Sequence, residues 1–228
     1  MSNDSMLADR EHAAGSTHFS SEHRENILNA AIEVFARDGY AAASTNDIVK
    51  RAKVSKGLLF HHFTNKKNLY TACQLYVLER YGEFMSKYVD LSSADFFDRI
   101  LCNMRTKIEF GRRHPQYLAL ISRAWYVDGE ENPLDRRSAE EYIVTNMQVG
   151  QLQNFFTGVD TTCFREGFDV SKLFNYTRLI TEAIWQRFSA SLNNDPDLMA
   201  SELDNYLAES EEILTLLKHG AYSGAEAE

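Results

Sequence analysis

The chain has 228 residues, of which 44% are apolar, with three prolines, eleven glycines and a net charge of −9. This composition predicts a folded protein built from long uninterrupted helices, an all-α fold. No run of about 18 apolar residues is present for a membrane span, and the N-terminus lacks the basic and apolar regions of a signal peptide. We therefore expect a cytoplasmic protein with no membrane partner.

The two ends of the chain differ from its interior. Residues 1–19 are polar and lack periodicity, which predicts a disordered N-terminal arm, and residues 220–228 are expected to form a flexible tail. Between them, a first helix is expected over Ser21–Arg37, with Gly39 as its natural stop.

The segment from Ser44 to Phe63 has the pattern of a helix-turn-helix. Ser44 and Asp47 stand at capping-box spacing, so a helix is expected to begin at Thr45. A short turn then leads to Ser55, a good N-cap for a second helix. Because that second helix is too short to be stable alone, it must be braced by neighbouring helices.

The second helix of this pair offers two kinds of surface. Leu59 and Phe63, four residues apart, are expected to face inward. The remaining residues would cover its outer surface: Lys56, Gly57, Leu58, Phe60, His61 and His62.

The rest of the chain predicts a helical bundle. We expect helices over residues 66–88 after an Asn65 cap, from a Ser92/Asp95 capping box to His114, from Pro115 to a loop at 128–133, over 133–156, over 170–192, and over 197–218 after an Asp195 cap. The last two would form an antiparallel hairpin. The 170–192 helix carries two apolar stripes, so one is expected to meet the core and the other a second subunit.

The helix-turn-helix residues resemble those of the TetR family of bacterial regulators. The family's recognition helix reads roughly S-x-G-x-[LIV]-Y-x-H-F-x-x-K, which is matched here by Ser55, Gly57, Leu59, Phe60, His62, Phe63 and Lys66. Upstream, residues 27–40 resemble the family's first helix and its glycine stop. The chain departs from the family at Lys53, where the turn usually has glycine, and at Phe60, where tyrosine is usual.

This resemblance implies a DNA-binding transcriptional regulator of the TetR/AcrR type. It implies a three-helix helix-turn-helix domain over residues 20–66, joined to a helical ligand-binding and dimerisation domain over 67–219. The expected function is a repressor that binds a palindromic double-stranded DNA operator as a homodimer and is released by a small-molecule effector. The alternatives are a helical protein-interaction module, or an activator without ligand-induced release.

Charge supports the DNA-binding expectation. Residues 20–70 carry eight basic and five acidic side chains, whereas residues 71–228 carry 15 and 25. Phosphate contacts need Lys and Arg, so the basic excess lies where DNA is expected and the acidic body stands away from it.

Individual roles follow for the DNA-binding residues. Ser44, Thr45 and Lys66 are assigned to phosphates, because helix N-termini present free amides to anions and a lysine acts as a point charge. Lys56 could read a guanine edge, Leu58 a thymine methyl, and Gly57 would let the backbone approach. By resemblance, His62 contacts phosphate or supports the helix and His61 lies on the DNA side, with His61 or Thr45 substituting for the hydroxyl that Phe60 lacks. The set is completed by Ser55.

The body offers weaker signals. An apolar effector site could be lined by Phe84, Met104, Trp125, Tyr126, Tyr142 and Met147, although each is more simply an ordinary core residue. The acidic body favours a neutral or cationic ligand, and an acyl ligand anchored by Arg105 or Arg123 is the alternative. The dimer interface is expected at Leu179, Ala183, Trp185, Tyr206, Ile213 and Leu217.

Catalysis and metal binding are not expected. No Glu has a His three residues later for a di-iron site, and there is no Gly-rich phosphate loop or G-x-S-x-G motif. The three cysteines lack zinc-binding spacing. His61 and His62 are adjacent in a helix and so point about 100° apart, which disfavours joint chelation. No cofactor is expected.

Overall fold

A computed structural model describes the backbone of residues 3–126, 155–191 and 195–223 and most side chains from residue 22 onward. In these residues the chain is helical, apart from turns, loops and an isolated β-bridge between Phe164 and Tyr222. The helices are α1 (Asn3–Ala42), α2 (Thr45–Ala52), α3 (Lys56–Phe63), α4 (Lys66–Tyr88), α5 (Phe96–Arg113), α6 (Pro115–Tyr126), α9 (Val170–Ser191) and α10 (Pro196–Ala221). The all-α prediction is confirmed.

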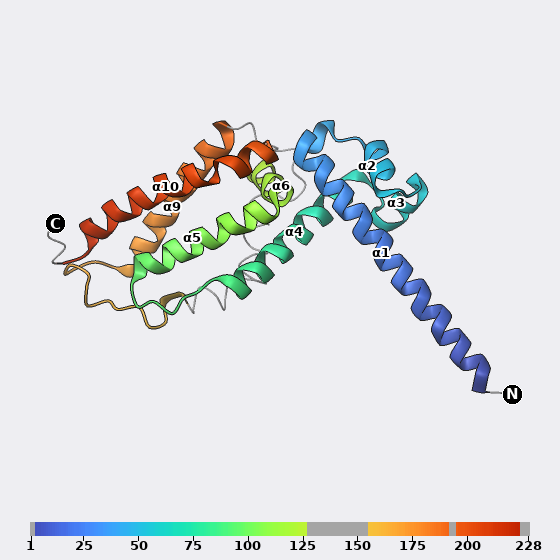
Figure 1. The fold of residues 1–228 in the computed structure, drawn as a ribbon, viewed down its shortest axis with the longest axis horizontal. Coiled ribbons are helices and arrows are strands. Elements are labelled where there is room, and N and C mark those ends of the chain that lie inside the picture. The colour runs from blue at the N-terminus through green and yellow to red at the C-terminus, as the bar shows by residue number, and fades with distance from the viewer. Residues whose placement is uncertain (1–2, 127–154, 192–194, 224–228) are drawn as a thin grey trace.

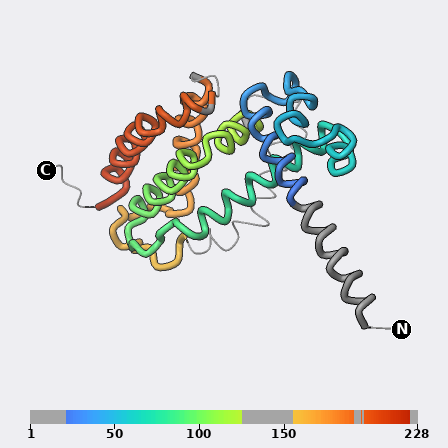
Figure 2. Tube along the Cα trace, turned by 45° about the vertical axis from the view of Figure 1, so that its right-hand side comes forward, coloured from blue at the N-terminus to red at the C-terminus, as the bar shows by residue number. Residues whose placement is uncertain are grey.

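The molecule has two parts joined by a long helix. The helices α2 and α3 lie at one end beside α1, and α5, α9 and α10 run lengthwise through the other part (Figure 1). The helix α4 begins next to α3 and continues along the body. A second viewpoint shows the same arrangement (Figure 2).

Helix ends mostly follow their local sequence signals. Ser55, Asn65 and Asp195 are N-caps whose side chains accept backbone N–H groups, as predicted. The predicted Ser92/Asp95 capping box is wrong: Asp95 itself is the N-cap of α5 and accepts from the amides of Phe97 and Asp98. The Asp95 carboxylate satisfies two of the free amides at the start of α5 and therefore does not bond the Ser92 amide.

The first helix begins further upstream than predicted and is interrupted at its predicted stop. It starts at Asn3, upstream of the expected Ser21, and is broken at Gly39, where φ is 74° and ψ is 174°. Glycine adopts this backbone conformation without the Cβ clash of other residues, which explains the predicted stop. Side-chain contacts are described only from residue 22 onward, so the arm expected over residues 1–19 stays a prediction.

One core holds the N-terminal helices against the body. It includes Ile27, Leu28 and Phe35 of α1 together with Leu69 and Tyr70 of α4, all fully buried. The same cluster includes Ala119 and Leu120 of α6 and Met199 of α10. The helix α4 contributes its first turns to this core, and the domain boundary expected after residue 66 stays a prediction.

A second core lies between α5, α9 and α10. It reaches the C-terminal end of the chain, where Tyr222 is buried and its ring lies 5.0 Å from that of Phe164. The flexible tail expected from residue 220 therefore starts too early, because packing of Ala221 and Tyr222 extends the ordered body. Residues 224–228 lie outside the described part of the chain. None of the helices in that part is long and apolar enough to cross a membrane.

Candidate DNA interface and effector body

The helix-turn-helix forms as its sequence predicts. Ile48 and Ala52 of α2 and Leu59 and Phe63 of α3 are buried, so each short helix is held by its apolar side. Ser55 Oγ accepts the Leu58 amide at 3.1 Å. Leu59 and Phe63 were predicted to face inward, and all four side chains attach the pair to the core of α1 and α4.

Two non-glycine residues, one on each side of α3, have strained backbone conformations with positive φ. Lys53, in the turn before it, has φ 54° and ψ 41°, the left-handed conformation that the departure from glycine predicted. Thr64, directly after the helix, has φ 62° and ψ −49°, and the amide of Asn65 reaches the Phe63 carbonyl at 2.6 Å. This is a γ-turn with positive φ, a rare and strained form. Strain of this kind clusters at functional sites.

The predicted Ser44/Asp47 capping box does not form. Ser44 is the N-cap of α2, but its side chain makes no capping hydrogen bond. Asp47 instead accepts from Arg37 at 3.0 Å and from Arg51 at 3.3 Å. Two guanidinium groups compete better for a carboxylate than one backbone amide does. The exposed Ser44 hydroxyl and the first amides of α2, next to the half-buried Thr45, are left facing outward.

The arginine contacts make a charged network between α1 and α2. The hydrogen bond from Arg37 holds the pKa of Asp47 below its usual range, with a smaller contribution from Arg51. Arg37 lowers the pKa of Asp38 in the same way, through contacts of 2.6 Å. Arg51 also reaches Glu33 at 3.2 Å. The Asp47–Arg51 contact has i,i+4 spacing within α2, whereas sequence spacing gave no signal for the contacts of Arg37 and Glu33, which link α1 to α2.

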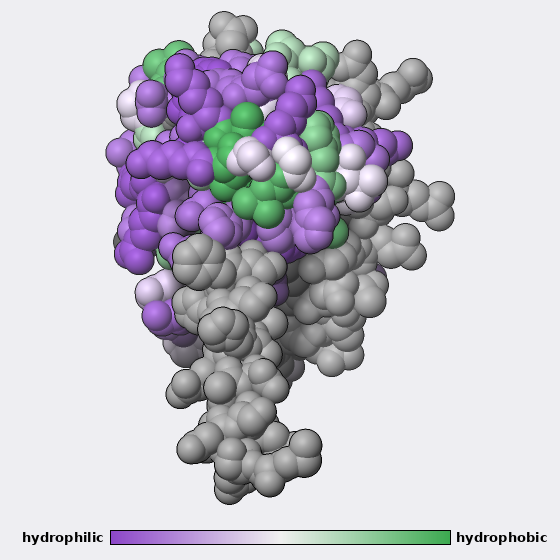
Figure 3. All heavy atoms as spheres, turned by 90° about the vertical axis from the view of Figure 1, so that its right-hand side faces the viewer, coloured by the Kyte–Doolittle hydropathy of each residue, from purple (hydrophilic) through white to green (hydrophobic). Residues whose placement is uncertain are grey.

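The recognition helix presents a mixed surface. Lys56, Gly57 and His61 are exposed, whereas Leu58 and Phe60 are half-buried. Phe60 packs against the core, so its ring is less available to DNA than predicted. Seen from this end of the molecule, a small apolar patch is surrounded by hydrophilic side chains (Figure 3).

Gly57 has room for a side chain within the protein. A Cβ added there would meet only Ser55 Oγ, at 3.8 Å. Internal packing therefore does not require glycine at this position. Close approach of an external partner to the backbone remains a physical reason for it.

The two histidines lie side by side, with ring centroids 5.5 Å apart. Partial burial lowers the pKa of His62, and the charges of His61, Arg24 and His23 lower it further. Neutral His62 can still donate one hydrogen bond. Among the described residues, no group of three or more His, Cys, Asp or Glu side chains is arranged to hold a metal ion.

Lys66 already has partners within the protein. Its ammonium donates to the carbonyl of Ala41 at 3.0 Å and lies 5.0 Å from the centre of the Tyr40 ring. It thereby links the start of α4 to the end of α1. Its role as a phosphate contact stays a prediction.

One exposed residue of this surface was missed from the sequence. Asn46, in the first turn of α2, accepts a hydrogen bond from Lys56 Nζ at 3.1 Å. Its position after the N-cap indicated only a helix start. Which side chain of α3 it would face depends on how the two helices cross.

Comparison with known proteins agrees with this geometry. The family model described as "Bacterial regulatory proteins, tetR family" matches residues 27–73. The Transposon Tn10 TetC protein of Escherichia coli is 40% identical over 147 residues, which cover 59% of this chain and 74% of that protein. The chain belongs to the TetR family. It is therefore related to DNA-binding transcription regulators, not to enzymes.

Other relatives match over shorter stretches or by fold alone. The transcriptional activator FasR of Mycolicibacterium smegmatis is 47% identical over 60 residues, which cover 26% of each chain. A TetR transcriptional regulator from Chloroflexus aurantiacus has a TM-score of 0.64 at 18% identity, covering 87% of this chain and 96% of that one. The shared fold thus includes the body, at an identity of 18% over the aligned chain.

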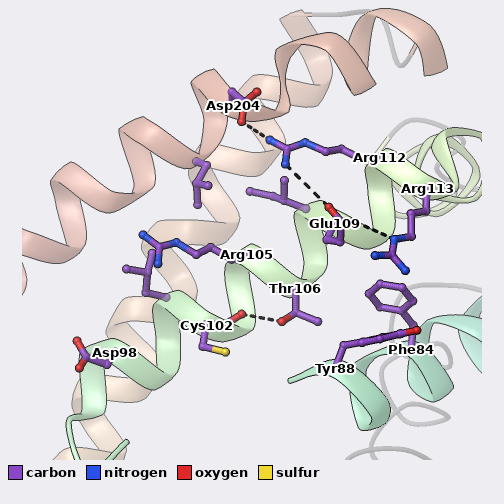
Figure 4. A pocket seen from close by; sticks show the side chains of 13 residues that line it. Phe84, Tyr88, Asp98, Cys102, Arg105, Thr106, Glu109, Arg112, Arg113 and Asp204 are labelled. Carbon is purple, nitrogen blue, oxygen red and sulfur yellow. Dashed lines mark hydrogen bonds and ion pairs between the residues drawn. The ribbon is translucent and has the colours of Figure 1, made fainter. Parts of the chain in front are cut away.

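The described body has a groove of about 580 Å³ between α4, α5 and α10. Phe84 and Tyr88 line one side, and the apolar floor includes Leu101, Ile108 and Leu207. Arg112 points toward Asp204 and Glu109, while Arg113 contacts Glu109 at 2.7 Å and covers the Phe84 ring (Figure 4).

The predicted effector residues do not come together as one described site. Phe84 lines the groove, whereas Met104 is buried in the second core. Tyr142 and Met147 lie outside the described residues, as do the side chains of Trp125 and Tyr126. Arg105, the alternative anchor, lines the groove and pairs with Glu211 at 2.8 Å.

Arg123, the other suggested anchor, contacts the DNA-binding helices instead. Its Nε donates to the Ala36 carbonyl at 2.8 Å and Nη2 to the Arg37 carbonyl at 3.1 Å. It thus joins α6 of the body to the C-terminal part of α1, at the same Arg37 whose side chain contacts Asp47.

The predicted dimer residues divide into two groups. Leu179 is 55% exposed and Ala183 is also exposed on α9. Trp185 and Tyr206 instead pack on each other, with ring centroids 4.9 Å apart, and the remaining two, Ile213 and Leu217, also pack against the second core. These four side chains pack within the subunit, and their assignment to a dimer interface stays a prediction. Tyr176, 57% exposed on α9, and Leu216, 65% exposed on α10, were missed.

Proposed function

We propose that this TetR-family chain is a repressor that binds a palindromic operator as a homodimer and is released by a small molecule. The observation that carries the proposal is the exposed end of the helix-turn-helix. There, Lys56 and Ser44 are exposed, and the Ser44 hydroxyl makes no capping hydrogen bond to the first amides of α2. These are the donors that phosphates and guanine edges require. A cytoplasmic location, with access to the chromosome, accompanies this function.

Dimerisation is supported by the outer face of α9. Tyr176, Leu179 and Ala183 recur at three- and four-residue spacing and are all exposed. A contiguous apolar stripe on a helix hairpin suits a two-fold interface. Two recognition helices related by this axis would read half-sites about 34 to 36 Å apart.

An effector response is supported by the contact of Arg123 with α1. The body and the helix-turn-helix share one core, and Arg123 adds two hydrogen bonds across their junction. A ligand that favours a different position of α6 would therefore shift α1 and the recognition helix. Linkage requires that DNA weaken ligand binding by the same factor.

Within the described part of the body, we place such a ligand in the groove beside Arg105. Its volume of about 580 Å³ suits a small molecule, and Leu101, Ile108 and Leu207 supply an apolar surface. An acyl ligand with an acidic group would compete with Glu211 for Arg105. This chemistry favours an amphipathic anion, in contrast to the neutral or cationic ligand suggested by net charge.

The test begins with selection of bound sequences from random duplex DNA at a fixed near-physiological salt concentration. An enriched palindrome is the expected result, and its affinity is then titrated with a series of fatty acids. A fall in operator affinity with ligand supports release. Absence of any enriched sequence from folded protein would overturn the operator-binding proposal in favour of an interaction module.

An activator is the second candidate, because the relative FasR is named as a transcriptional activator. Transcription in vitro from the selected operator placed beside a promoter separates the two functions. A repressor lowers the transcript level when added to RNA polymerase, and an activator raises it. The result does not depend on knowing the effector.

A further inference from the structure

Asn46 and Lys56 form a hydrogen-bonded pair between the two helices of the helix-turn-helix. Lys56 Nζ donates to Asn46 Oδ1 at 3.1 Å, and both residues are exposed. Asn46 is the second residue of α2, and Lys56 is the first residue of α3. The contact therefore joins the N-terminal ends of both helices.

This position is the one from which bases are read. In a helix-turn-helix, the N-terminal residues of the second helix reach base edges in the major groove. Lys56 is at that end of α3. Asn46 touches the Lys56 ammonium and therefore lies near the same base edges. It does so although α2, which carries it, crosses the DNA backbone.

The chemistry of the pair is defined by the lysine. An ammonium group only donates, so the amide oxygen of Asn46 must face it and the amide nitrogen must point elsewhere. Asn46 then offers two N–H donors, and Lys56 keeps two of its three. The pair is thus a cluster of donors at the N-terminal ends of α2 and α3.

A donor cluster prefers one base in the major groove. Guanine presents two adjacent acceptors there, N7 and O6, whereas adenine places its N6 donor beside N7. Cytosine also presents a donor. A free asparagine would instead favour adenine, because it can both donate and accept, but here the amide oxygen is occupied by Lys56.

We infer that Asn46 and Lys56 act as one base-reading unit that selects guanine in each half-site. The inference rests on the proposed operator binding. In this unit, the Asn46 amide oxygen positions the Lys56 ammonium. The Asn46 amide nitrogen donates to the guanine or to the adjacent base. A purely structural contact is a weaker account, because a hydrogen bond between two exposed side chains contributes little to stability.

The test uses the full chain and the operator selected by the wild-type protein. Dissociation constants are measured for wild type, Asn46→Ala, Lys56→Ala and the double variant. Each is measured on the selected operator and on one with the guanine pair replaced by an adenine pair in both half-sites. Thermal melts followed by circular dichroism establish that the variants are folded. Lys67→Ala, an exposed lysine at the start of α4, is the matched control.

Wild type is expected to bind the guanine operator at least about tenfold more tightly than the adenine one. Each single variant should reduce that ratio, and the double variant should be no worse than Lys56→Ala, because the two side chains act together. Lys67→Ala should change affinity for both operators equally. Specific wild-type binding with an unchanged base preference in Asn46→Ala, or with additive single effects, would overturn the inference. Failure of wild type to select any sequence would instead overturn the proposed function.

Discussion

At the scale of single residues, the interface combines strained backbone with titratable side chains. Lys53 and Thr64 have positive φ, 54° and 62°, on either side of α3, the first in the left-handed helical conformation and the second in a γ-turn. Both precede a residue that caps a helix, Ser55 and Asn65 respectively, so each turn sets the direction of the following helix. His62 lies within α3, between these turns.

Replacing Lys53 by glycine is expected to stabilise the protein. The left-handed conformation costs an L residue roughly 1–2 kcal/mol, whereas the added flexibility of glycine in the unfolded chain opposes this by up to about 1 kcal/mol. The free energy of unfolding in urea should therefore rise by up to about 1 kcal/mol, and Thr64→Gly should act in the same direction. Lys50→Gly, in the regular part of α2, should lower it by about 1 kcal/mol. Equal effects at all three positions would contradict the role of strain.

The protein should lose stability as pH falls below about 6.5, partly through His62. Because burial and neighbouring charges lower its pKa in the folded state from 6.5, the unfolded chain binds a proton more readily. The stability is fully present above that pH and is lost as the pH falls toward the folded pKa. Burial also lowers the pKa of His114, which adds to the effect.

Melting temperatures measured between pH 8 and pH 5 check this. His62→Gln should flatten part of the decline, and a further His114→Gln change should flatten more of it. The separate loss below about pH 4, where Asp38 and Asp47 become protonated, should remain in both variants because the pKa values of those carboxyls are lowered from 3.8. A decline that His62→Gln leaves intact would contradict the assignment.

At the scale of elements, a buried arginine fastens α5 to the loop that precedes α9. Arg99 is 3% exposed and donates to the carbonyls of Ser93, Phe155 and Thr157, the last at 2.8 Å. Charged side chains are seldom buried without such partners. The Arg99 side chain therefore joins the start of α5 to Phe155 and Thr157, which lie 56 and 58 residues later in the sequence.

Arg99→Met should lower the free energy of unfolding by about 3 kcal/mol, because it leaves three carbonyl groups without their donor. Urea unfolding measures this directly. Arg105→Met is the matched control on the same helix: its side chain is 58% exposed and its ion pair with Glu211 should be worth less than about 1 kcal/mol. Similar losses for both variants would show that the Arg99 contacts are not special.

At the scale of the whole molecule, the shared core makes α1, α4 and α6 a single mechanical unit. Leu69 and Tyr70 of α4 are buried with α1, and Leu120 of α6 belongs to the same cluster. We therefore expect a change in the body to be transmitted through packed side chains instead of a flexible linker. The outer face of α9 is the other feature that appears only at this scale.

Leu179→Glu is expected to convert a dimer into a monomer, because it places a charge in an apolar interface. Sedimentation should show the change in mass, and operator affinity should fall at least about tenfold, since one recognition helix alone makes few contacts. Phe168→Glu, at a position 45% exposed outside α9, is the control and should leave the mass unchanged. A monomeric wild type, or a dimeric Leu179→Glu variant, would contradict the proposed interface.

Local sequence signals predicted the family and most helix ends in the described part of the chain. Periodicity, caps and prolines act through contacts within one or two turns, so Ser55, Asn65, Gly39 and Pro115 mark helix ends correctly. The recognition-helix motif carries the family in the same local way. The Ser44/Asp47 capping box does not form because the Asp47 carboxylate accepts from Arg37 of α1 and Arg51 of α2 instead.

Which apolar stripes face outward, and which polar side chains form hydrogen bonds with each other, became clear only from the tertiary structure. Trp185 and Tyr206 have the same periodicity as Leu179, yet they pack inside the subunit. The pairing of Asn46 with Lys56 and of Arg123 with α1 likewise depends on how helices cross. Sequence spacing specifies the faces of one helix, whereas contacts between helices are set by the packing of all of them together.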